Sequence, residues 1–467
     1  MQPLTFTFLA AFCGIGPGAL GFLRAAVRLL GTEGRFVCLG GIDVDPLACI
    51  DFERLTKALA WCIDVRDITP EELRERYGED APDVVFGSPP CQGASRLLST
   101  KKSEEQHYQD LNELTEVWVE KMLAAWPTRP PKLVLIENVP GLPTRAKAML
   151  ARVRKMLRAH GYVFHASTHD CGEIGGLAQH RQRYLLVARH QATCPPLLYQ
   201  PPKRRVRGVG EVLETLPMPA TEAAKVWGEL HAMPRLAWRN WLRLALIPAG
   251  GDWRDLDGVL KEGQARREVF RRHAVQRWDE PHPAVTGPGG HSVEAVADPR
   301  IAVPEGTAWH RGIYGVNAWT EPTGVISGGA DNPSRGTFSV ADPRNRALVA
   351  DVRTLTIEEA LAIDLDPKRP PPFTPVIVAE DGTWHRPMTL LELAALQGIP
   401  STLDGQPLKL AGTRTQIATH VGNAVPVGAA EAIGERMLVA LVEGALGTMS
   451  LGGGNVWVDP HATGALS

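Results

Sequence analysis

The first 190 residues alternate between short apolar runs and segments of helical composition, and this alternation restricts the chain to an α/β fold. Apolar runs at Leu4–Ala11, Phe36–Ile42 and Asp83–Gly87 are typical of strands in a parallel sheet. A glycine turn, Phe12–Gly18, separates the first run from a segment of helical composition, Ala19–Leu30. We therefore expect a Rossmann-like, doubly wound sheet, which binds its ligands at the carboxyl ends of the strands.

Acidic side chains stand at the ends of two expected strands. Asp43 follows the strand Phe36–Ile42, and Asp64 follows a shorter run that begins at Cys62. An acidic residue about 20 to 30 residues after a glycine turn usually holds a pair of ribose hydroxyls. The alternative for either aspartate is a helix N-cap or a turn residue. Because both follow the glycine turn in strand order, we favour a site for a nucleoside cofactor.

A cysteine lies on the loop after the strand Asp83–Gly87, in the run Pro90, Cys91 and Gln92. Two successive prolines restrict this loop, so that the thiol is held in place, which is typical of a nucleophile. The alternative is a buried structural cysteine. The next strand ends at Glu137. Since a carboxylate raises the pKa of a neighbouring thiol, we interpret Glu137 as an acid or hydrogen-bond partner of the substrate.

Two arginines, Arg181 and Arg183, occupy alternate positions just before an expected strand, Tyr184–Ala188. On an extended segment their side chains point the same way. In a cleft they suit an anion or an electron-rich carbonyl, and the alternative is an exposed charge pair.

Composition limits the class of protein. At 467 residues, with 44% hydrophobic and 22% charged residues, the chain is long enough for two or three domains. No apolar run approaches the roughly 20 residues of a membrane span. The amino terminus lacks a signal-peptide pattern, and the seven cysteines have no CxxC or metal-site spacing. We therefore expect no membrane segment, no metal and a cytoplasmic location. A net charge of −2 confines any nucleic-acid surface to a local patch.

Taken in order, these motifs resemble those of the AdoMet-dependent DNA (cytosine-5)-methyltransferases of bacterial and phage type. The resemblance extends to Arg386–Glu392 and Leu396–Pro400, which match the family's ninth motif, and to Val421–Pro426, which matches the tenth. It spans residues 12 to about 430, with a long unmatched middle. It implies a methyltransferase sheet, S-adenosyl-L-methionine as cofactor, and methylation at C5 of a flipped cytosine through a covalent adduct of Cys91 with C6.

The resemblance also assigns roles to individual residues. It implies catalytic roles for Cys91, Glu137, Arg181 and Arg183. It implies cofactor contacts by Phe12, Gly14, Gly16, Asp43, Asp64, Asn423 and Ala424. It implies contacts with the substrate DNA by Pro90, Gln92, Ser95, Arg96, Asn138, Val139 and Gln179.

Two departures from the family pattern leave alternatives open. Ala10 replaces the usual acidic residue before the first motif, and the fifth motif at Asp110–Leu114 is degenerate. These departures leave open the transfer of a modified group from an AdoMet derivative. Cytosine-5 methylation of RNA (tRNA) is a second alternative, against which the long middle segment argues. A catalytically inactive DNA-binding regulator is disfavoured because all four catalytic residue types are present.

The motifs also predict the domain organisation. We expect a catalytic, AdoMet-binding domain over 1–190 and a smaller, β-rich target-recognition domain over 191–385. The ninth and tenth motifs at 386–446 would return to the catalytic domain, and 447–467 would form a tail. The middle segment carries a basic run, Lys203–Arg207, for which phosphate contact is favoured over ordinary solvated surface.

A loose internal duplication lies within the middle segment. Trp278–Arg300 and Trp319–Arg344 begin and end on similar sequences, which suggests paired β-ribbons that either read bases or only build the domain. The expected partner is double-stranded DNA bound by a monomer near the nucleoid. A cognate restriction endonuclease would act on the same site if the enzyme belongs to a restriction-modification system.

Overall fold

The computed structural model describes residues 3–90, 106–196, 200–247, 352–380 and 383–447, together with a few isolated positions and four short strands between 275 and 342. Four of the expected site residues lie outside this part of the chain: Cys91, Gln92, Ser95 and Arg96.

The structure divides into two compact units. The described residues of Met1–Val212, Pro322–Gly328 and Leu390–Ser467 form unit 1, and those of Leu213–Glu321 and Gly329–Thr389 form unit 2. The strands of unit 1 are β1 (Leu4–Ala11), β2 (Ala26–Leu29), β3 (Thr32–Asp43), β4 (Ala60–Cys62), β5 (Val84–Gly87), β6 (Leu133–Asn138), β7 (Tyr162–Asp170), β8 (Gln182–His190), β16 (Thr402–Leu403) and β17 (Gln406–Pro407). Its helices are α1 (Pro17–Arg24), α2 (Pro46–Thr56), α3 (Pro70–Tyr77), α5 (Gln106–Ala125), α6 (Leu142–Arg145), α7 (Lys147–Ala159), α8 (Cys171–Gly175), α14 (Leu390–Leu396), α15 (Arg414–Asn423) and α16 (Val427–Leu446), with α9 (Val209–Leu213) at the boundary.

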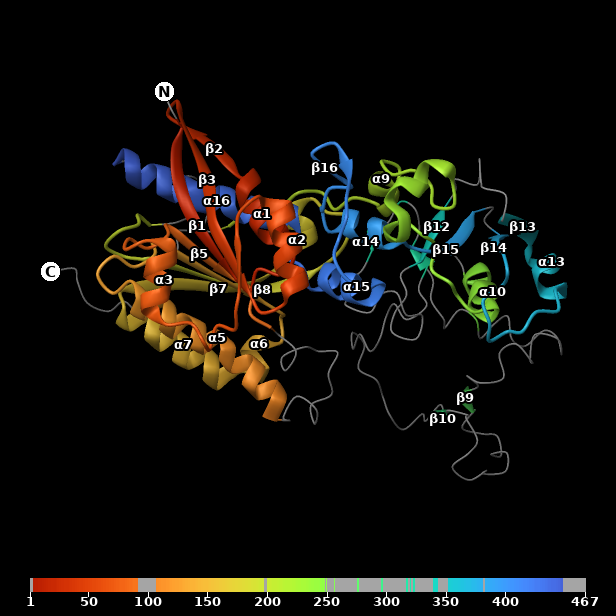
Figure 1. Cartoon of the computed structure of the whole chain (residues 1–467), viewed down its shortest axis with the longest axis horizontal. Coiled ribbons are helices and arrows are strands. Elements are labelled where there is room, and N and C mark those ends of the chain that lie inside the picture. Colours follow the sequence, from red (N-terminus) through yellow and green to blue (C-terminus); the bar gives the residue numbers. More distant parts are fainter. Residues whose placement is uncertain are drawn as a thin grey trace. The chain divides into compact units, whose positions relative to one another are not determined.

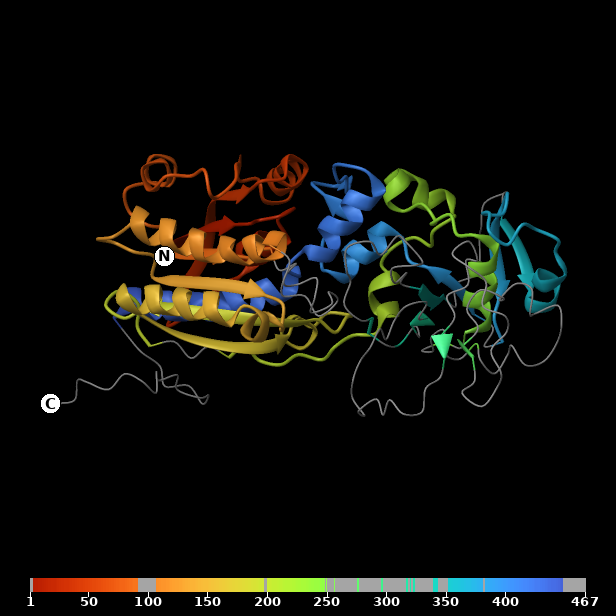
Figure 2. The same ribbon diagram turned by 90° about the horizontal axis from the view of Figure 1, so that it is seen from below.

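The core of unit 1 is an eight-stranded sheet in the order β2-β3-β1-β5-β6-β8-β7, with β4 beside β3 (Figure 1). Strands β4, β3, β1, β5 and β6 are parallel, and β8 is antiparallel to both β6 and β7. One face of the sheet packs against α1 and α16, and the other packs against α3, α5 and α7 (Figures 1 and 2). Helices therefore cover both faces, and the expected doubly wound sheet is confirmed.

The expected helix Ala19–Leu30 is wrong in its second half. Helix α1 ends at Arg24, and the chain continues as β2, which pairs antiparallel with β3. Leu30 and Gly31 have φ values of 48° and 79° and join Leu29 to its partner Thr32. Positive φ at both central residues is the geometry of a two-residue hairpin, which periodicity alone did not reveal.

Helix α16 returns from the carboxyl-terminal part of the sequence to the first strands. Ala430, Ile433 and Met437 lie in the same buried cluster as Phe22 and Phe8. The close approach of α16 to α1 requires a glycine at 21, because a Cβ there would lie 2.4 Å from the carbonyl oxygen of Val427. The tenth motif, just before α16, is thereby fixed beside the amino-terminal half of the sheet.

Unit 2 contains a five-stranded sheet in the order β11-β12-β15-β14-β13. Its elements are η2 (Glu222–Leu230), α10 (Trp238–Leu246), α13 (Ile357–Ala362), β9 (Val275–Gln276), β10 (Ala295–Val296), β11 (Val316–Asn317), β12 (Ser339–Asp342), β13 (Val352–Thr356), β14 (Thr374–Val378) and β15 (Trp384–Pro387). Its core packs Trp241 of α10 against Trp384 of β15, with the rings stacked at 6.4 Å. A smaller, β-rich region is thus present in addition to the large sheet of unit 1.

The strands of unit 2 reflect the internal duplication. In the first copy β9 and β10 pair parallel, with Val275 opposite Ala295. In the second copy β11 and β12 pair parallel at equivalent positions, with Val316 opposite Ser339. The glycine-containing loops of both copies lie outside the described residues. Each short parallel pair joins a strand just before the start of one copy to a strand near its end. The paired β-ribbons expected from the sequence stay a prediction.

Candidate active site

The sequence-predicted residues converge on one edge of the sheet. Because β4, β3, β1, β5 and β6 run parallel, their carboxyl ends all lie at this edge. Strand β8 runs the other way, so its first residues lie at the same edge beside the end of β6. The glycine turn, both aspartates, Pro90, Glu137 and the two arginines thus share a single edge.

Glu137 is the buried carboxylate at this edge. Its Oε2 accepts a hydrogen bond of 2.7 Å from Ser88 Oγ, at the end of the neighbouring strand β5. Arg183 Nε lies 2.9 Å from Oε1, and both side chains are largely buried. Among the described residues no group donates a hydrogen bond to Oε1 in good geometry. A buried carboxylate oxygen with spare acceptor capacity, next to a guanidinium, is suited to a polar ligand.

Asn138 supports the loop that leads to Cys91. Its side-chain amide donates a 3.2 Å hydrogen bond to the carbonyl of Pro89, while its Oδ1 accepts from the backbone N–H of Val139. Asn138 is buried, and Val139 packs partly buried against the core. The structure therefore places Asn138 beneath the proline loop, where it fixes the start of the segment that carries the thiol.

Of the two arginines, only Arg183 lies at Glu137. The Arg181 side chain is fully buried, and its Nη2 donates to the carbonyls of Gly422 and Ala424, at 2.9 Å each. Arg181 therefore joins the start of β8 to the end of α15. The sequence treated the two arginines alike, whereas the structure gives them separate partners.

Replacing Arg181 by methionine is expected to lower stability by about 2–4 kcal/mol, which is several degrees of melting temperature. The reason is that two buried carbonyls lose a charge-assisted donor, while the apolar length of the side chain is kept. Circular dichroism melting measures the change. Arg129→Met is the control, because Arg129 forms only an exposed ion pair with Asp80. Equal melting temperatures for both variants would contradict the assignment.

Gln179, expected at the DNA, lies in the interior. Its amide donates to Gln397 Oε1 at 2.7 Å and to the carbonyl of Leu396 at 3.1 Å. Gln397 in turn donates to the carbonyl of Val421 at 3.0 Å. Both glutamine side chains are fully buried. This chain of amides connects the segment before β8 with α14 and α15, so Gln179 is placed in the framework of the site.

A second thiol lies close to the catalytic edge. Cys171 begins α8 and interacts electrostatically with Arg183 and Glu137. It is buried in the core, and this burial raises the pKa of the thiol to about 12, although Arg183 opposes the shift. At neutral pH the thiolate fraction of such a group is negligible. Cys171 is therefore excluded as a nucleophile by its burial.

If the chain catalyses the methyl transfer that its motifs imply, replacing Cys171 by alanine is expected to leave the rate within about twofold of the unchanged protein, since a buried thiol of high pKa does no chemistry. The rate is measured as transfer of a labelled methyl group to duplex DNA. Loss of turnover with unchanged melting temperature would show instead that this thiol takes part in the reaction.

The nucleoside side of the edge is built around Asp43. Its Oδ2 accepts from the backbone N–H of Gly14 at 2.8 Å, and its Oδ1 accepts from the N–H of Asp45 at 3.0 Å. Burial raises the pKa of Asp43, while these two N–H groups oppose the shift. Each oxygen keeps a further lone pair, which suits the hydroxyls of a ribose.

The glycine turn leaves room for a ligand. Gly14 has a φ of 52°, and a Cβ placed on it would meet no atom within 4 Å. Gly16 has a φ of 96° and immediately precedes α1. Phe12 also has a positive φ, 51°, which is strained for a side chain of its size, and its ring packs edge-on against Trp118 at 6.4 Å. The open space before Gly14 fits the close approach of a cofactor.

The remaining residues expected at the cofactor differ in their exposure and in their hydrogen-bond partners. Asp64 follows β4 and is held by Arg66, whose Nη2 lies 2.6 Å from its Oδ2; this contact lowers the pKa of Asp64. Asn423 is exposed at the end of α15, whereas Ala424 is buried and its carbonyl accepts from Arg181. Asn423 is therefore the exposed residue of the tenth motif.

Sequence reasoning missed Val44, Ser88 and Gln397. Val44 lies between the two aspartates that end β3, and its apolar side chain is 64% exposed. The order Asp43, Val44, Asp45 was visible in the sequence, but the exposure of the valine was not. Ser88 and Gln397 had no such signal, because their roles depend on partners far away in the chain.

Metal and membrane features are absent from the part of the chain that the structure describes. In that part no cluster of three or more histidine, cysteine, aspartate or glutamate side chains has the arrangement of a metal site. The described helices are also too short or too polar to cross a membrane.

The fold is that of a methyltransferase. The structure of a methyltransferase from Entamoeba histolytica, EhMeth, superposes with a TM-score of 0.51 at 13% identity, covering 94% of this chain and 99% of that one. This likeness shows that the chain shares the fold of that methyltransferase.

The sequence model of the C-5 cytosine-specific DNA methylase family matches residues 6–217 and 333–439, and the chain belongs to that family. The Type II methylase M.HgiDII of Herpetosiphon aurantiacus is 25% identical over 285 residues, 59% of this chain and 74% of that protein. The Type II methyltransferase M.AgeI of Thalassovita gelatinovora is 30% identical over 213 residues, 44% of each chain. The resemblance inferred from the order of the motifs is confirmed, and the protein is a DNA (cytosine-5)-methyltransferase.

Proposed function

We propose that the enzyme methylates one cytosine within a specific duplex DNA sequence, through a covalent bond between Cys91 and C6 of the flipped base. The observation that carries this proposal is the Glu137 site: a buried carboxylate with a free acceptor position, beside Arg183, at the tip of the strand next to the one that leads to Cys91. The two Type II relatives support a role in a restriction-modification system, with a cognate endonuclease as partner.

The chemistry explains why a thiol and a carboxylate belong together here. C5 of cytosine is a weak nucleophile, and addition of the Cys91 thiolate to C6 moves the electrons of the C5–C6 double bond toward C5 and N3. Glu137 gives a proton to N3 as the ring gains electron density and accepts a hydrogen bond from the amino group, which stabilises the base. The proton returns to Glu137 when the aromatic ring is restored. After the methyl group is joined to C5, a base removes the C5 proton, the double bond re-forms and Cys91 leaves as a thiolate.

The two arginines have different roles in this proposal. Arg183 holds Glu137 and donates to the cytosine O2, because it is the guanidinium that lies at the carboxylate. Arg181 acts as a positioning residue, since its donors are engaged by the backbone of Gly422 and Ala424.

S-Adenosyl-L-methionine, when bound, supplies the methyl group, and the residues at the other half of the edge fit its nucleoside. Asp43 would hold the ribose, the space before Gly14 would admit the ligand, and the exposed Val44 would pack against the adenine. Asp64 would accept from the adenine amine while it remains paired with Arg66. Phe12, Gly16, Asn423 and Ala424 complete the proposed cofactor site.

DNA must reach this edge with its target base out of the stack, because C6 is inaccessible within a duplex. We assign closure over the DNA to the basic loop after Cys91, with Ser95 and Arg96 at the backbone. Base reading is assigned to the middle segment, 191–385, which contains the duplicated strand pairs.

Mass spectrometry of nucleosides tests the proposal. Duplex DNA and tRNA are incubated separately with the protein and S-adenosyl-L-methionine, and 5-methylcytosine is expected in the DNA alone. Bisulfite sequencing of DNA from cells that express the chain then gives the sequence that is methylated. Methylation of tRNA alone, or another modified cytosine in the DNA, would overturn the proposal.

A further inference from the structure

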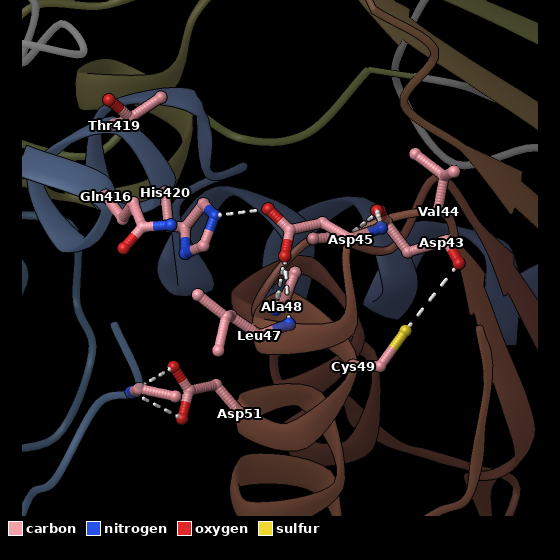
Figure 3. A network of polar contacts seen from close by, with 12 residues as sticks. Asp43, Val44, Asp45, Leu47, Ala48, Cys49, Asp51, Gln416, Thr419 and His420 are labelled. Atoms are coloured by element: carbon pink, nitrogen blue, oxygen red, sulfur yellow. Dashed lines mark hydrogen bonds and ion pairs between the residues drawn. The ribbon is translucent and has the colours of Figure 1, made fainter. Parts of the chain in front are cut away.

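A histidine just before the tenth motif contacts the edge of the sheet at which the cofactor is proposed to bind. His420, on α15, lies with its Nε2 2.9 Å from Oδ2 of Asp45, at the start of α2 (Figure 3). The histidine side chain is 13% exposed and the aspartate 40%. This contact joins two segments that are 375 residues apart in the sequence.

Asp45 connects His420 with Asp43, the residue expected to bind the ribose. The other carboxylate oxygen, Oδ1, caps α2 by accepting from the N–H groups of Leu47 and Ala48 at 2.8 and 3.3 Å. The backbone N–H of Asp45 donates a hydrogen bond to Oδ1 of Asp43, and Figure 3 includes this contact. A side chain that fixes Asp45 therefore also fixes one of the two donors that orient Asp43.

The end of α15 is anchored independently of this contact. Near the end of the helix, Arg181 donates to the carbonyl of Gly422 and Gln397 donates to the carbonyl of Val421. These two contacts connect the helix end with β8 and α14. The helix begins with a capping box between Thr413 and Gln416. Both ends of α15 are thus fixed by groups other than Asp45, and His420 links the helix to Asp45.

The surroundings of His420 define what it contributes. Nε2 faces Asp45, while Nδ1 is buried and has no hydrogen-bond partner among the described residues. The next carboxylate is Asp51, which interacts electrostatically with His420 but is itself held by Arg54 and the backbone N–H of Ala411. His420 thus has one directed contact, made through Nε2.

We propose that His420 is a positioning residue for the cofactor: through Asp45 it holds Asp43 in the orientation that binds the ribose. This inference rests on the proposed role of Asp43 as the ribose ligand. It predicts that loss of the Nε2 contact weakens cofactor binding and leaves the chemical step unchanged. The reason is that His420 has no described contact with Glu137, which is proposed to bind the substrate base, or with the partners of Glu137, Ser88 and Arg183.

Two substitutions of matched polarity separate positioning from general loss of a side chain. In His420→Gln the amide nitrogen stands near the place of Nε2 and can still donate to Asp45, whereas in His420→Asn it stands near Nδ1 and cannot. Equilibrium binding of S-adenosyl-L-homocysteine to the full chain, measured by titration calorimetry, is expected to weaken roughly five- to twenty-fold in His420→Asn. His420→Gln is expected to bind within about threefold of the unchanged protein.

A second readout does not depend on the ligand. Hydrogen exchange in the ligand-free protein is expected to accelerate at the α2 start, at Leu47 and Ala48, in His420→Asn but not in His420→Gln. Thr419→Ala is the control on the same helix, because the Thr419 hydroxyl only bonds the carbonyl of Thr415 within α15. In steady-state assays His420→Asn is expected to raise KM for the cofactor and to leave kcat unchanged.

Asp43→Asn distinguishes failure of this inference from failure of the proposed cofactor site. If Asp43→Asn binds the ligand as well as the unchanged protein, the assignment of the ribose site is wrong. If Asp43→Asn binds poorly while His420→Asn binds normally with unchanged exchange at α2, the positioning role of His420 is wrong. A fall in kcat without a change in binding would also overturn it.

Discussion

Replacing Cys91 by serine is expected to reduce methyl transfer to duplex DNA by roughly 10⁴-fold or more, because the nucleophile of the proposed reaction is lost. A serine hydroxyl is far less acidic than a thiol, so a much smaller fraction of it is present as the nucleophilic anion at neutral pH. The assay follows transfer of a labelled methyl group with saturating cofactor. Binding of S-adenosyl-L-homocysteine should remain, since the cofactor residues lie on other strands.

The covalent bond itself is tested with a duplex that carries 5-fluorocytosine at the target position. Fluorine cannot leave as a proton does, so the adduct is expected to persist and to shift the protein on a denaturing gel. Cys171→Ala is the matched control, since it removes the buried thiol near Glu137 and should still be trapped. An adduct that survives Cys91→Ala would refute the assignment of the nucleophile.

Replacing Glu137 by glutamine is expected to lower kcat by about 10²–10⁴-fold, the usual contribution of a positioned acid or base. The amide is similar in shape and can still accept from Ser88, but it has no acidic proton to give to N3 and no charge to pair with Arg183. Single-turnover methylation measures the change without the complication of product release.

Ser88→Ala is the control for the Glu137 substitution. It removes one hydrogen bond to Oε2 and leaves the ion pair with Arg183, so that a loss of less than about tenfold in kcat is expected. If Glu137→Gln retained more than a third of the activity, the carboxylate would not be the group that stabilises the base.

Much of the site was predictable because it depends on strand order. Residues at the carboxyl ends of parallel strands meet at one edge, so Asp43, Asp64 and Glu137 could be grouped before their contacts were known. The glycine turn was predictable for a related reason, since positive φ at Gly14 and Gly16 is readily adopted only without a side chain.

The partners of buried polar groups were not predictable. Arg181 and Arg183 have the same spacing and the same expected direction, yet the first binds main chain of the tenth motif and the second lies at Glu137. Gln179 was expected at the DNA and is buried against Gln397, 218 residues away. Such pairings depend on how α14 and α15 pack, which local patterns do not encode.

By itself the sequence determined the α/β class, the family and the edge of the sheet at which the reaction groups gather. These depend on periodicity, on turn residues and on the order of motifs, all of which are local properties of the chain. The tertiary structure alone decided which arginine serves the carboxylate, that Cys171 is too deeply buried to react, and that His420 is joined to Asp45. The physical reason is that burial and hydrogen-bond partners are set by packing between distant segments.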